Sequence, residues 1–320
     1  LKGEETPRRG DGGDAPAEMP RMWDGDGAWR DEGVPPAPLP LEDEHDPCAR
    51  LIAASNAKPP DASRRTGVGG GGSTLAGEIS RLERAFGGAF AARAVATCAD
   101  ASGRTALSHA ARSGDVDGLD ACVRVRKKEH FAGDAAPALD VGDSHDVGPL
   151  TLAAWQGHTH VVDYLLRNGA SPNRRDSFGV AALHKAVGHG HLGAALRILG
   201  DGGADVNLRV GDIADSVPAH YRAVSRHQTA LHIACYPTPN PKFVAALLRF
   251  GADPDVRDDL GNTALHYACG ACDVAAVRLL TRAGADTTKE NADGHTPGDV
   301  VPTDPGCNEG LVFDVLRGLD

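Results

Sequence analysis

Five segments of this 320-residue chain repeat one pattern, and that repetition limits the possible folds more than any other feature. Each copy runs from a short polar stretch into a helix-like run of small residues, as in Thr229-Ala-Leu-His232 and Thr263-Ala-Leu-His266. One leucine per copy is in register, with steps of 43, 33, 48 and 34 residues between Leu107, Leu150, Leu183, Leu231 and Leu265. A unit of about 33 residues cannot bury its apolar face alone, so neighbouring copies must stack.

The second halves of the copies are also shared, because Gly169-Ala-Ser, Gly251-Ala-Asp and Gly284-Ala-Asp each follow an apolar stripe. With a period near 33 and Thr-Ala-Leu-His cores, the pattern resembles the ankyrin repeat, whose signature is Thr-Pro-Leu-His-x-Ala. The resemblance runs from about residue 97 to the C-terminus. It implies an all-α solenoid of stacked helix–turn–helix repeats with β-turn fingers.

Individual residues of the pattern have physical roles. Thr229 and Thr263 precede a first helix, where a hydroxyl can accept hydrogen bonds from unpaired N–H groups. Gly251 and Gly284 lie where a second helix ends, a position that favours glycine. The leucines should be buried between repeats. The resemblance further implies that His232 and its equivalents link neighbouring turns by hydrogen bonds.

The aligned copies predict six repeats, of which the last is a C-terminal cap. Their approximate bounds are 97–142, 143–175, 176–223, 224–257, 258–290 and 291–320. The two long steps place insertions before Asp143 and before Val224. Insertions in solenoids usually fall in loops on one face, often the binding face.

Residues 76–96 precede the repeats and predict one amphipathic helix. Ile79, Leu82, Phe86 and Phe90 recur at steps of three and four residues. Because a stacked solenoid leaves an apolar face open at each end, we expect this helix to cover the first repeat.

Residues 1–75 are rich in proline, glycine and charge, and their only aromatic side chains are Trp23 and Trp29. Such a segment buries too little apolar surface to offset its ordering entropy, so we predict disorder. The glycine run before Ser73 lacks the lysine and the preceding strand of a phosphate-binding loop. It is interpreted as a linker.

The seven cysteines are scattered and odd in number, which predicts reduced thiols in a cytoplasmic or nuclear protein. The spacing His232-x-x-Cys235 and His266-x-x-Cys269-x-x-Cys272 is also compatible with zinc ligands. Equivalent positions of stacked helices lie about 10 Å apart, too far for shared Zn–S bonds of about 2.3 Å. We therefore favour structural roles and predict no metal, no cofactor and no catalytic residue.

The composition of the chain argues against two classes of function, nucleic-acid binding and membrane spanning. The formal charge of −11 argues against nucleic acid as the main partner, because phosphate binding requires a basic face. No apolar run is long enough for a membrane span. Aromatic residues make up only 4% of the chain, which suits a helical solenoid with cores of Ala, Leu and Val.

The resemblance also implies a binding surface, since ankyrin proteins usually contact partners through fingertips and the exposed side of the first helices. The positions that match are His145, Val147, Trp155, Gln156, Phe178, Val180, Lys185, His189, Tyr221, Arg222, Arg226, Tyr236, Leu260, Asn262 and Tyr267. Packing of Trp155 and Tyr236 against neighbouring fingers is the alternative. Asn207, in Asp-Val-Asn, resembles asparagines that an oxygenase hydroxylates in this family, although an ordinary turn residue is favoured.

The predicted function is a monomeric protein–protein interaction scaffold or adaptor. The alternative is a targeting or regulatory module of a larger enzyme, such as a ubiquitin ligase or kinase, or of a channel. The sequence does not name the partner, because one repeat fold supports many recognition surfaces.

Overall fold

The computed structural model describes residues 46–56, 74–128, 139–201, 203–211, 227–236, 239–303 and 307–318. These residues contain fourteen helices and isolated β-bridges. The helices are α1 (Pro47–Asn56), α2 (Leu75–Phe86), α3 (Gly88–Thr97), α4 (Ala106–Ser113), α5 (Val116–Lys128), α6 (Pro149–Gln156), α7 (Thr159–Arg167), α8 (Ala182–Gly188), α9 (Leu192–Asp201), α11 (Ala230–Cys235), α12 (Pro241–Arg249), α13 (Ala264–Gly270), α14 (Val274–Arg282) and α15 (Glu309–Leu316).

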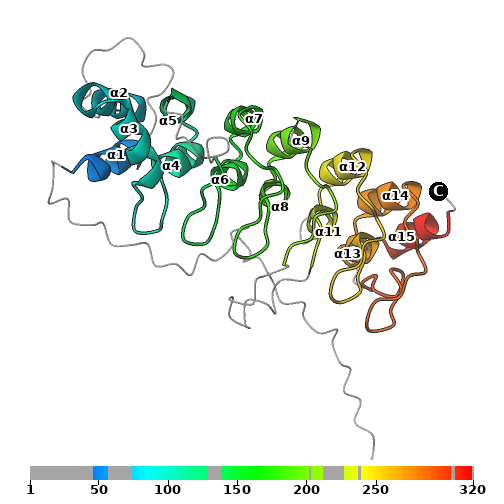
Figure 1. Cartoon of the computed structure of the whole chain (residues 1–320). Helices are drawn as coiled ribbons and strands as arrows, with labels where there is room; N and C mark the ends of the chain where they lie inside the picture. The colour runs from blue at the N-terminus through cyan, green and yellow to red at the C-terminus, as the bar shows by residue number, and fades with distance from the viewer. Residues whose placement is uncertain are drawn as a thin grey trace, which may run out of the picture. The chain divides into compact units, whose positions relative to one another are not determined.

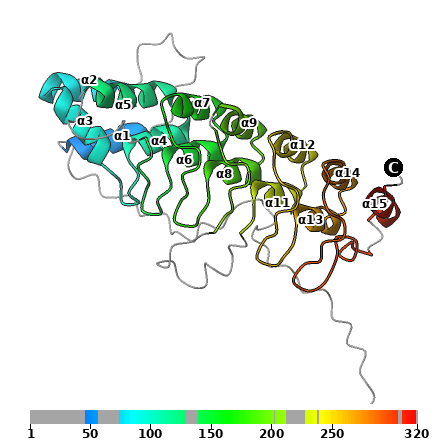
Figure 2. The ribbon, with the colours of Figure 1, turned by 45° about the vertical axis from the view of Figure 1, so that its right-hand side comes forward.

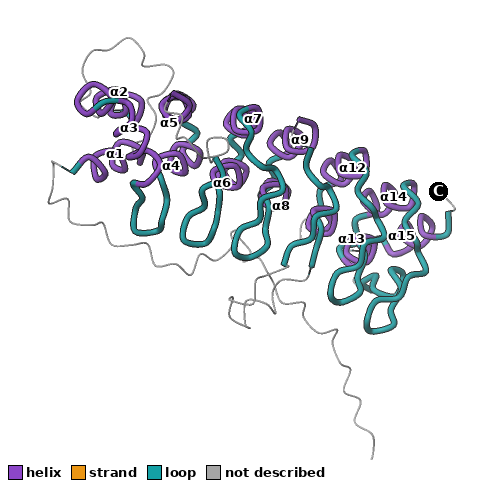
Figure 3. The backbone as a smooth tube through the Cα atoms, in the orientation of Figure 1, coloured by secondary structure: helices purple, strands orange, loops and turns teal. Residues whose placement is uncertain are grey.

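The helices form stacked antiparallel pairs, as the all-α prediction requires (Figures 1 and 2). We call α4, α6, α8, α11 and α13 the inner helices, and α5, α7, α9, α12 and α14 the outer helices. Each helix packs against its equivalent in the next repeat, for example α6 on α8 and α7 on α9. Loops extend in one row on the side of the inner helices, and they are the predicted fingers (Figure 3).

The core consists of small and branched side chains that let the helices approach closely. All five in-register leucines are buried, including Leu231 and Leu265, so the predicted repeat register is confirmed at these positions. Ala153 and Ala154 are fully buried between α6 and its neighbours. Gly157 ends α6 in a left-handed conformation (φ 75°), which a residue with a Cβ rarely adopts.

The N-terminal end differs from the prediction in two respects. First, residues 47–56 lie in the segment predicted to be disordered, yet they form α1. Its Leu51 is fully buried, and Arg50 forms an ion pair of 3.2 Å with the buried Glu78 of α2. These contacts supply the burial that the composition of residues 1–75 did not suggest. Residues 1–45 and 57–73 lie outside the described residues.

Second, the single helix predicted over 76–96 is two helices, because Gly87 adopts φ +86° and separates α2 from α3. The predicted stripe is split accordingly. Ile79 and Leu82 are buried, whereas Phe86 and Phe90 are 58% and 41% exposed.

At the C-terminal end, α15 packs against α14 and buries Val312 and Val315. Residues 297–300 form turns where the other repeats have an inner helix, next to Gly298 and Pro302. The assignment of residues 291–320 as a C-terminal capping repeat stays a prediction.

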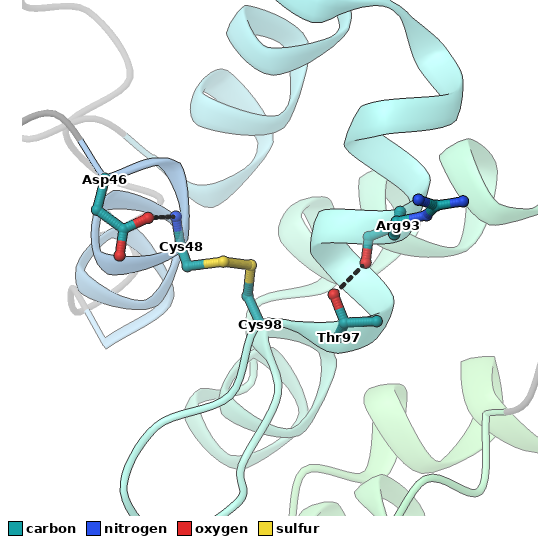
Figure 4. The surroundings of a disulfide bond; sticks show 5 residues. All are labelled: Asp46, Cys48, Arg93, Thr97 and Cys98. Carbon is teal, nitrogen blue, oxygen red and sulfur yellow. Dashed lines mark hydrogen bonds between the residues drawn. A yellow bond between two sulfur atoms is a disulfide. The ribbon is translucent and has the colours of Figure 1, made fainter.

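Four of the seven cysteines form disulfides, so the prediction of reduced thiols is wrong for them. Cys48 is bonded to Cys98, which joins α1 to the residue after α3 (Figure 4). Cys272 is bonded to Cys307, which joins the end of α13 to the segment before α15. The partners are 50 and 35 residues apart in sequence, so only the folded chain brings their Cα atoms to 5.2 and 5.6 Å. The other three thiols are free and buried.

Candidate partner-binding surface

The fingers are held by a repeated carboxylate or amide. Oδ1 of Asp143 accepts hydrogen bonds from the backbone N–H groups of His145 and Val147, at 2.9 and 3.0 Å. The same pattern recurs at Asp100, Asp176, Asp258 and Asn291. Such side-chain acceptors fix a turn that the backbone alone would not define.

Backbone hydrogen bonds also join one finger to the next. The N–H of Ser144 donates to the carbonyl of Ser102 at 2.9 Å, and that of Ser177 donates to His145 at 2.8 Å. The N–H of Ala292 makes the same contact with Leu260. These bonds hold the tips of the three linked pairs of fingers at fixed spacing.

The motif histidines make the links that the family resemblance implied. Nδ1 of His232 accepts from the N–H of Thr229 at 3.1 Å, while its Nε2 contacts the carbonyl of Asn262 at 3.2 Å. The Thr229 hydroxyl also bonds to Nδ1, at 2.8 Å. His184 and His266 repeat the arrangement with the carbonyls of the next finger.

This geometry requires a neutral imidazole with its proton on Nε2. Burial lowers the pKa of His184 from 6.5 to about 4, and it also lowers the pKa values of His232 and His266. These histidines are therefore structural links rather than general bases.

Trp155, at the end of α6, is the centre of the predicted surface. It is half-buried, with the ammonium of Lys185 4.6 Å from its ring centroid and the His189 ring 5.6 Å away. Burial, together with nearby Lys185 and His191, lowers the pKa of His189 to about 4. The contacts of Trp155 are with the next inner helix and its turn, and part of its ring remains accessible.

The other predicted contact residues divide by exposure. His145, Gln156 and Leu260 are exposed, and Phe178 and Tyr236 are half-buried. The rings of His145 and Phe178 stack at 5.9 Å across adjacent fingers, and Tyr236 lies 5.7 Å from the ring of Tyr267. Tyr221, Arg222 and Arg226 lie outside the described residues.

Four predicted contact residues are buried, so their assignment to the surface is wrong. Val147 and Val180 are buried, and their backbone N–H groups donate to Asp143 and Asp176. The side chain of Asn262 accepts from Asn291, and its carbonyl binds His232. The fourth residue, Tyr267, is 2% exposed.

Tyr267 is held by polar contacts on both sides. Its hydroxyl donates to Oδ2 of Asp258 at 2.6 Å and accepts from the Gln228 side chain at 2.9 Å. His109 occupies the same position in the first repeat and bonds to Asp100 at 2.9 Å. This position therefore fastens the inner helix to its own finger.

Asn207 belongs to another repeated contact. Its Oδ1 accepts from the N–H of Asp253 at 2.9 Å, just as Asn173 accepts from Asp205 and Asp255 accepts from Asp286. Its presence in the chain is thus explained by stacking between repeats.

The sequence interpretation placed His158 and His191 at repeat positions but did not predict their contacts with the preceding repeat. Nε2 of His158 donates to the carbonyl of Arg112 at 3.0 Å, in the preceding repeat. His191, 33 residues later, lies against Gly157, where a Cβ would clash with the imidazole. The pairs Gly157-His158 and Gly190-His191, 33 residues apart, are the sequence pattern that could have indicated these contacts.

The described residues contain no group of three or more His, Cys, Asp or Glu side chains that could hold a metal ion. Burial raises the pKa of the Cys269 thiol to about 12 and also raises that of Cys235, so both thiols keep their protons. No described helix combines the length and hydropathy needed to cross a bilayer.

Comparison with known proteins agrees with this architecture. A family model for ankyrin repeats in three copies matches residues 137–210 and 214–297. ANK repeat-containing protein nipk-1 of Caenorhabditis elegans is 30% identical over 62% of this chain and 33% of its own length. NF-kappa-B inhibitor delta of Mus musculus is 28% identical over 54% of this chain and 67% of its own length.

A putative palmitoyltransferase ZDHHC13 of Danio rerio is 28% identical over 54% of this chain, but over only 25% of its own length. The chain thus spans a third of nipk-1 and a quarter of this palmitoyltransferase. The residues matched by the family model include most of the stacked repeats described above. This chain belongs to the ankyrin repeat family.

Proposed function

We propose that this chain is a non-enzymatic scaffold or adaptor, and that it binds a partner protein on its fingers and inner helices. Ankyrin repeats are protein-interaction modules, and one relative is named as an inhibitor of NF-kappa-B. We therefore propose that the chain acts as a regulatory adaptor.

The observation that carries the proposal is the accessible cluster of Trp155, Lys185 and His189. A half-buried tryptophan held by a cation costs little side-chain entropy when a partner covers it, and such residues dominate binding energy at interfaces. Tyr236, on α11's C-terminal side, adds a second aromatic anchor to the same row of inner helices.

The test uses the full chain as bait, with the captured protein identified by mass spectrometry and its Kd measured. We expect Trp155→Ala and Tyr236→Ala each to weaken binding by about 1–3 kcal/mol. Arg249→Ala and Arg282→Ala, exposed on outer helices, are the controls. Melting temperatures of all four variants separate lost binding from lost folding. If only the arginine variants bind weakly, the partner contacts the outer helices and the proposal is wrong.

The alternative is a targeting or regulatory module of a larger enzyme or channel. The palmitoyltransferase relative favours this alternative, because the match covers only 25% of its length and the rest of that protein lies outside the matched repeats. Sequencing the complete transcript distinguishes the two, because a catalytic or channel domain in the same reading frame would establish the alternative.

The compartment, oligomeric state and modification are further parts of the proposal. Three free buried thiols suit the cytoplasm or nucleus, whereas the two disulfides favour oxidising conditions. Thiol labelling of protein taken directly from cells decides between these two kinds of compartment.

Analytical ultracentrifugation tests whether the chain is a monomer, as we propose. Mass spectrometry of the peptide containing Asn207 tests hydroxylation, which adds one oxygen atom.

A further inference from the structure

An exposed aromatic corner joins α2 to α3, and neither the stack nor the proposed partner surface uses it. The corner consists of residues 85–90, Ala-Phe-Gly-Gly-Ala-Phe. The rings of Phe86 and Phe90 lie 4.9 Å apart, with 58% and 41% of each residue exposed. The two neighbouring aromatic side chains therefore form one contiguous apolar patch at the surface, and apolar patches rimmed by polar residues can serve as protein or membrane contact sites.

The corner is firmly attached to the folded chain. Gly87 makes the turn with φ +86°, and both helices bury their opposite faces through Ile79 and Leu82 of α2 and Val95 of α3. The two helices also pack against α5. The phenylalanines therefore project from a fixed base and cannot turn inward without breaking that packing.

The side chains around the corner are mainly cationic. Arg81, Arg84 and Arg93 are exposed, and Arg93 points away from α1 and the disulfide in Figure 4. Glu83 is the half-buried carboxylate of the same helix end. The other acidic side chain of α2, Glu78, is buried and paired with Arg50 and Arg81. The exposed charge at the corner is thus positive, although the chain as a whole carries −11.

We propose that this corner inserts into an anionic membrane surface. The exposed rings and the cationic side chains around them are complementary to a surface that is apolar below and anionic above. At a bilayer, the two rings would enter the boundary between headgroups and acyl chains, while the long arginine side chains reach anionic headgroups. Local cations are needed because the negative net charge opposes approach. Helices α2 and α3 lie at the N-terminal end of the stack, separated from α6 by α4 and α5, which leaves the proposed partner surface free (Figure 1).

The experiment is flotation of the full chain with vesicles of phosphatidylcholine alone, or of equal parts of phosphatidylcholine and phosphatidylserine. The chain should float with the phosphatidylserine vesicles and far less with phosphatidylcholine. Phe86→Ser/Phe90→Ser should weaken binding to the anionic vesicles by about tenfold or more. Arg84→Gln/Arg93→Gln should weaken it by about tenfold or more as well, and added salt should act in the same direction.

The matched control is Phe250→Ser/Arg249→Gln, because Phe250 is 39% exposed at the end of α12 and follows an exposed arginine. It should bind as the unchanged protein does. Circular dichroism and melting temperature confirm folding of each variant. Absence of flotation with anionic vesicles overturns the proposal, as does flotation that both corner variants retain. If vesicles do not bind but the serine variant loses a dimer or a captured protein, the corner contacts protein and the proposal is wrong.

Discussion

Acidification should destabilise the stack through its buried histidines, and His184 allows the size of the effect to be worked out. Its pKa is about 4 in the folded chain, against 6.5 for an ordinary histidine. Below pH 6.5 the unfolded chain takes up a proton that the folded chain excludes. Folded stability is therefore complete above pH 6.5 and falls as the pH drops toward 4.

With 1.36 kcal/mol per pKa unit, the loss from His184 alone is about 2 kcal/mol at pH 5 and reaches about 3 kcal/mol below pH 4. The pKa values of His232 and His266 are shifted in the same direction, so they add to the loss. The assay is urea denaturation at pH 8 and pH 5, followed by circular dichroism.

The matched variant is His184→Gln, because an amide can accept from the N–H of Ala181 and donate to the carbonyl of Leu208 without titrating. Its stability should fall by about 2 kcal/mol less than that of the unchanged chain between pH 8 and pH 5. Equal losses in the two proteins would refute the assignment of a neutral, buried His184.

Three other perturbations test the packing. Leu265→Ala should lower the free energy of unfolding by about 2–5 kcal/mol, because the side chain is fully buried; a loss below 1 kcal/mol, measured in urea, would contradict the repeat register. Asp143→Ala should cost about 2–4 kcal/mol, since two finger N–H groups and Arg104 lose their acceptor; hydrogen exchange should show faster opening of that finger, and unchanged exchange would contradict its role. Cys48→Ser/Cys98→Ser should lower stability by about 2–4 kcal/mol under oxidising conditions, and a reductant should then change its melting temperature less than that of the unchanged chain.

The features that the sequence predicted are those encoded by neighbouring residues. Leu231, His232 and the preceding threonine act within one turn of helix, so their spacing identifies both the helix and its register. The disulfide partner of Cys48 is 50 residues away, and no local pattern indicates it. Helix α1 was missed because its burial depends on Leu51 meeting other segments rather than on a long apolar stripe.

The surface was predicted less well than the fold, for a similar reason. Trp155 is accessible as expected, but Tyr267 has an equally favourable position in the repeat and is buried between fingers. Its hydroxyl meets Asp258 and Gln228, which come from two separate parts of the chain. The position of a residue within its repeat can be read from the local sequence. Whether that residue is buried depends on contacts with neighbouring fingers, which the local sequence does not show.

The two disulfides also determine how the chain would respond to a pulling force applied at its ends. Force passing along the backbone crosses directly from Cys48 to Cys98 and from Cys272 to Cys307. The segments inside each covalent loop bear no load, so α2 and α3 in the first loop and α14 in the second gain no length when the repeats are pulled apart. Among the described helices, extension would come from α4 to α13 and from α15, and the length held inside the two loops would appear only after reduction. A tether attached to this chain would thus lengthen in two stages, and the redox state of its surroundings would determine whether the second occurs.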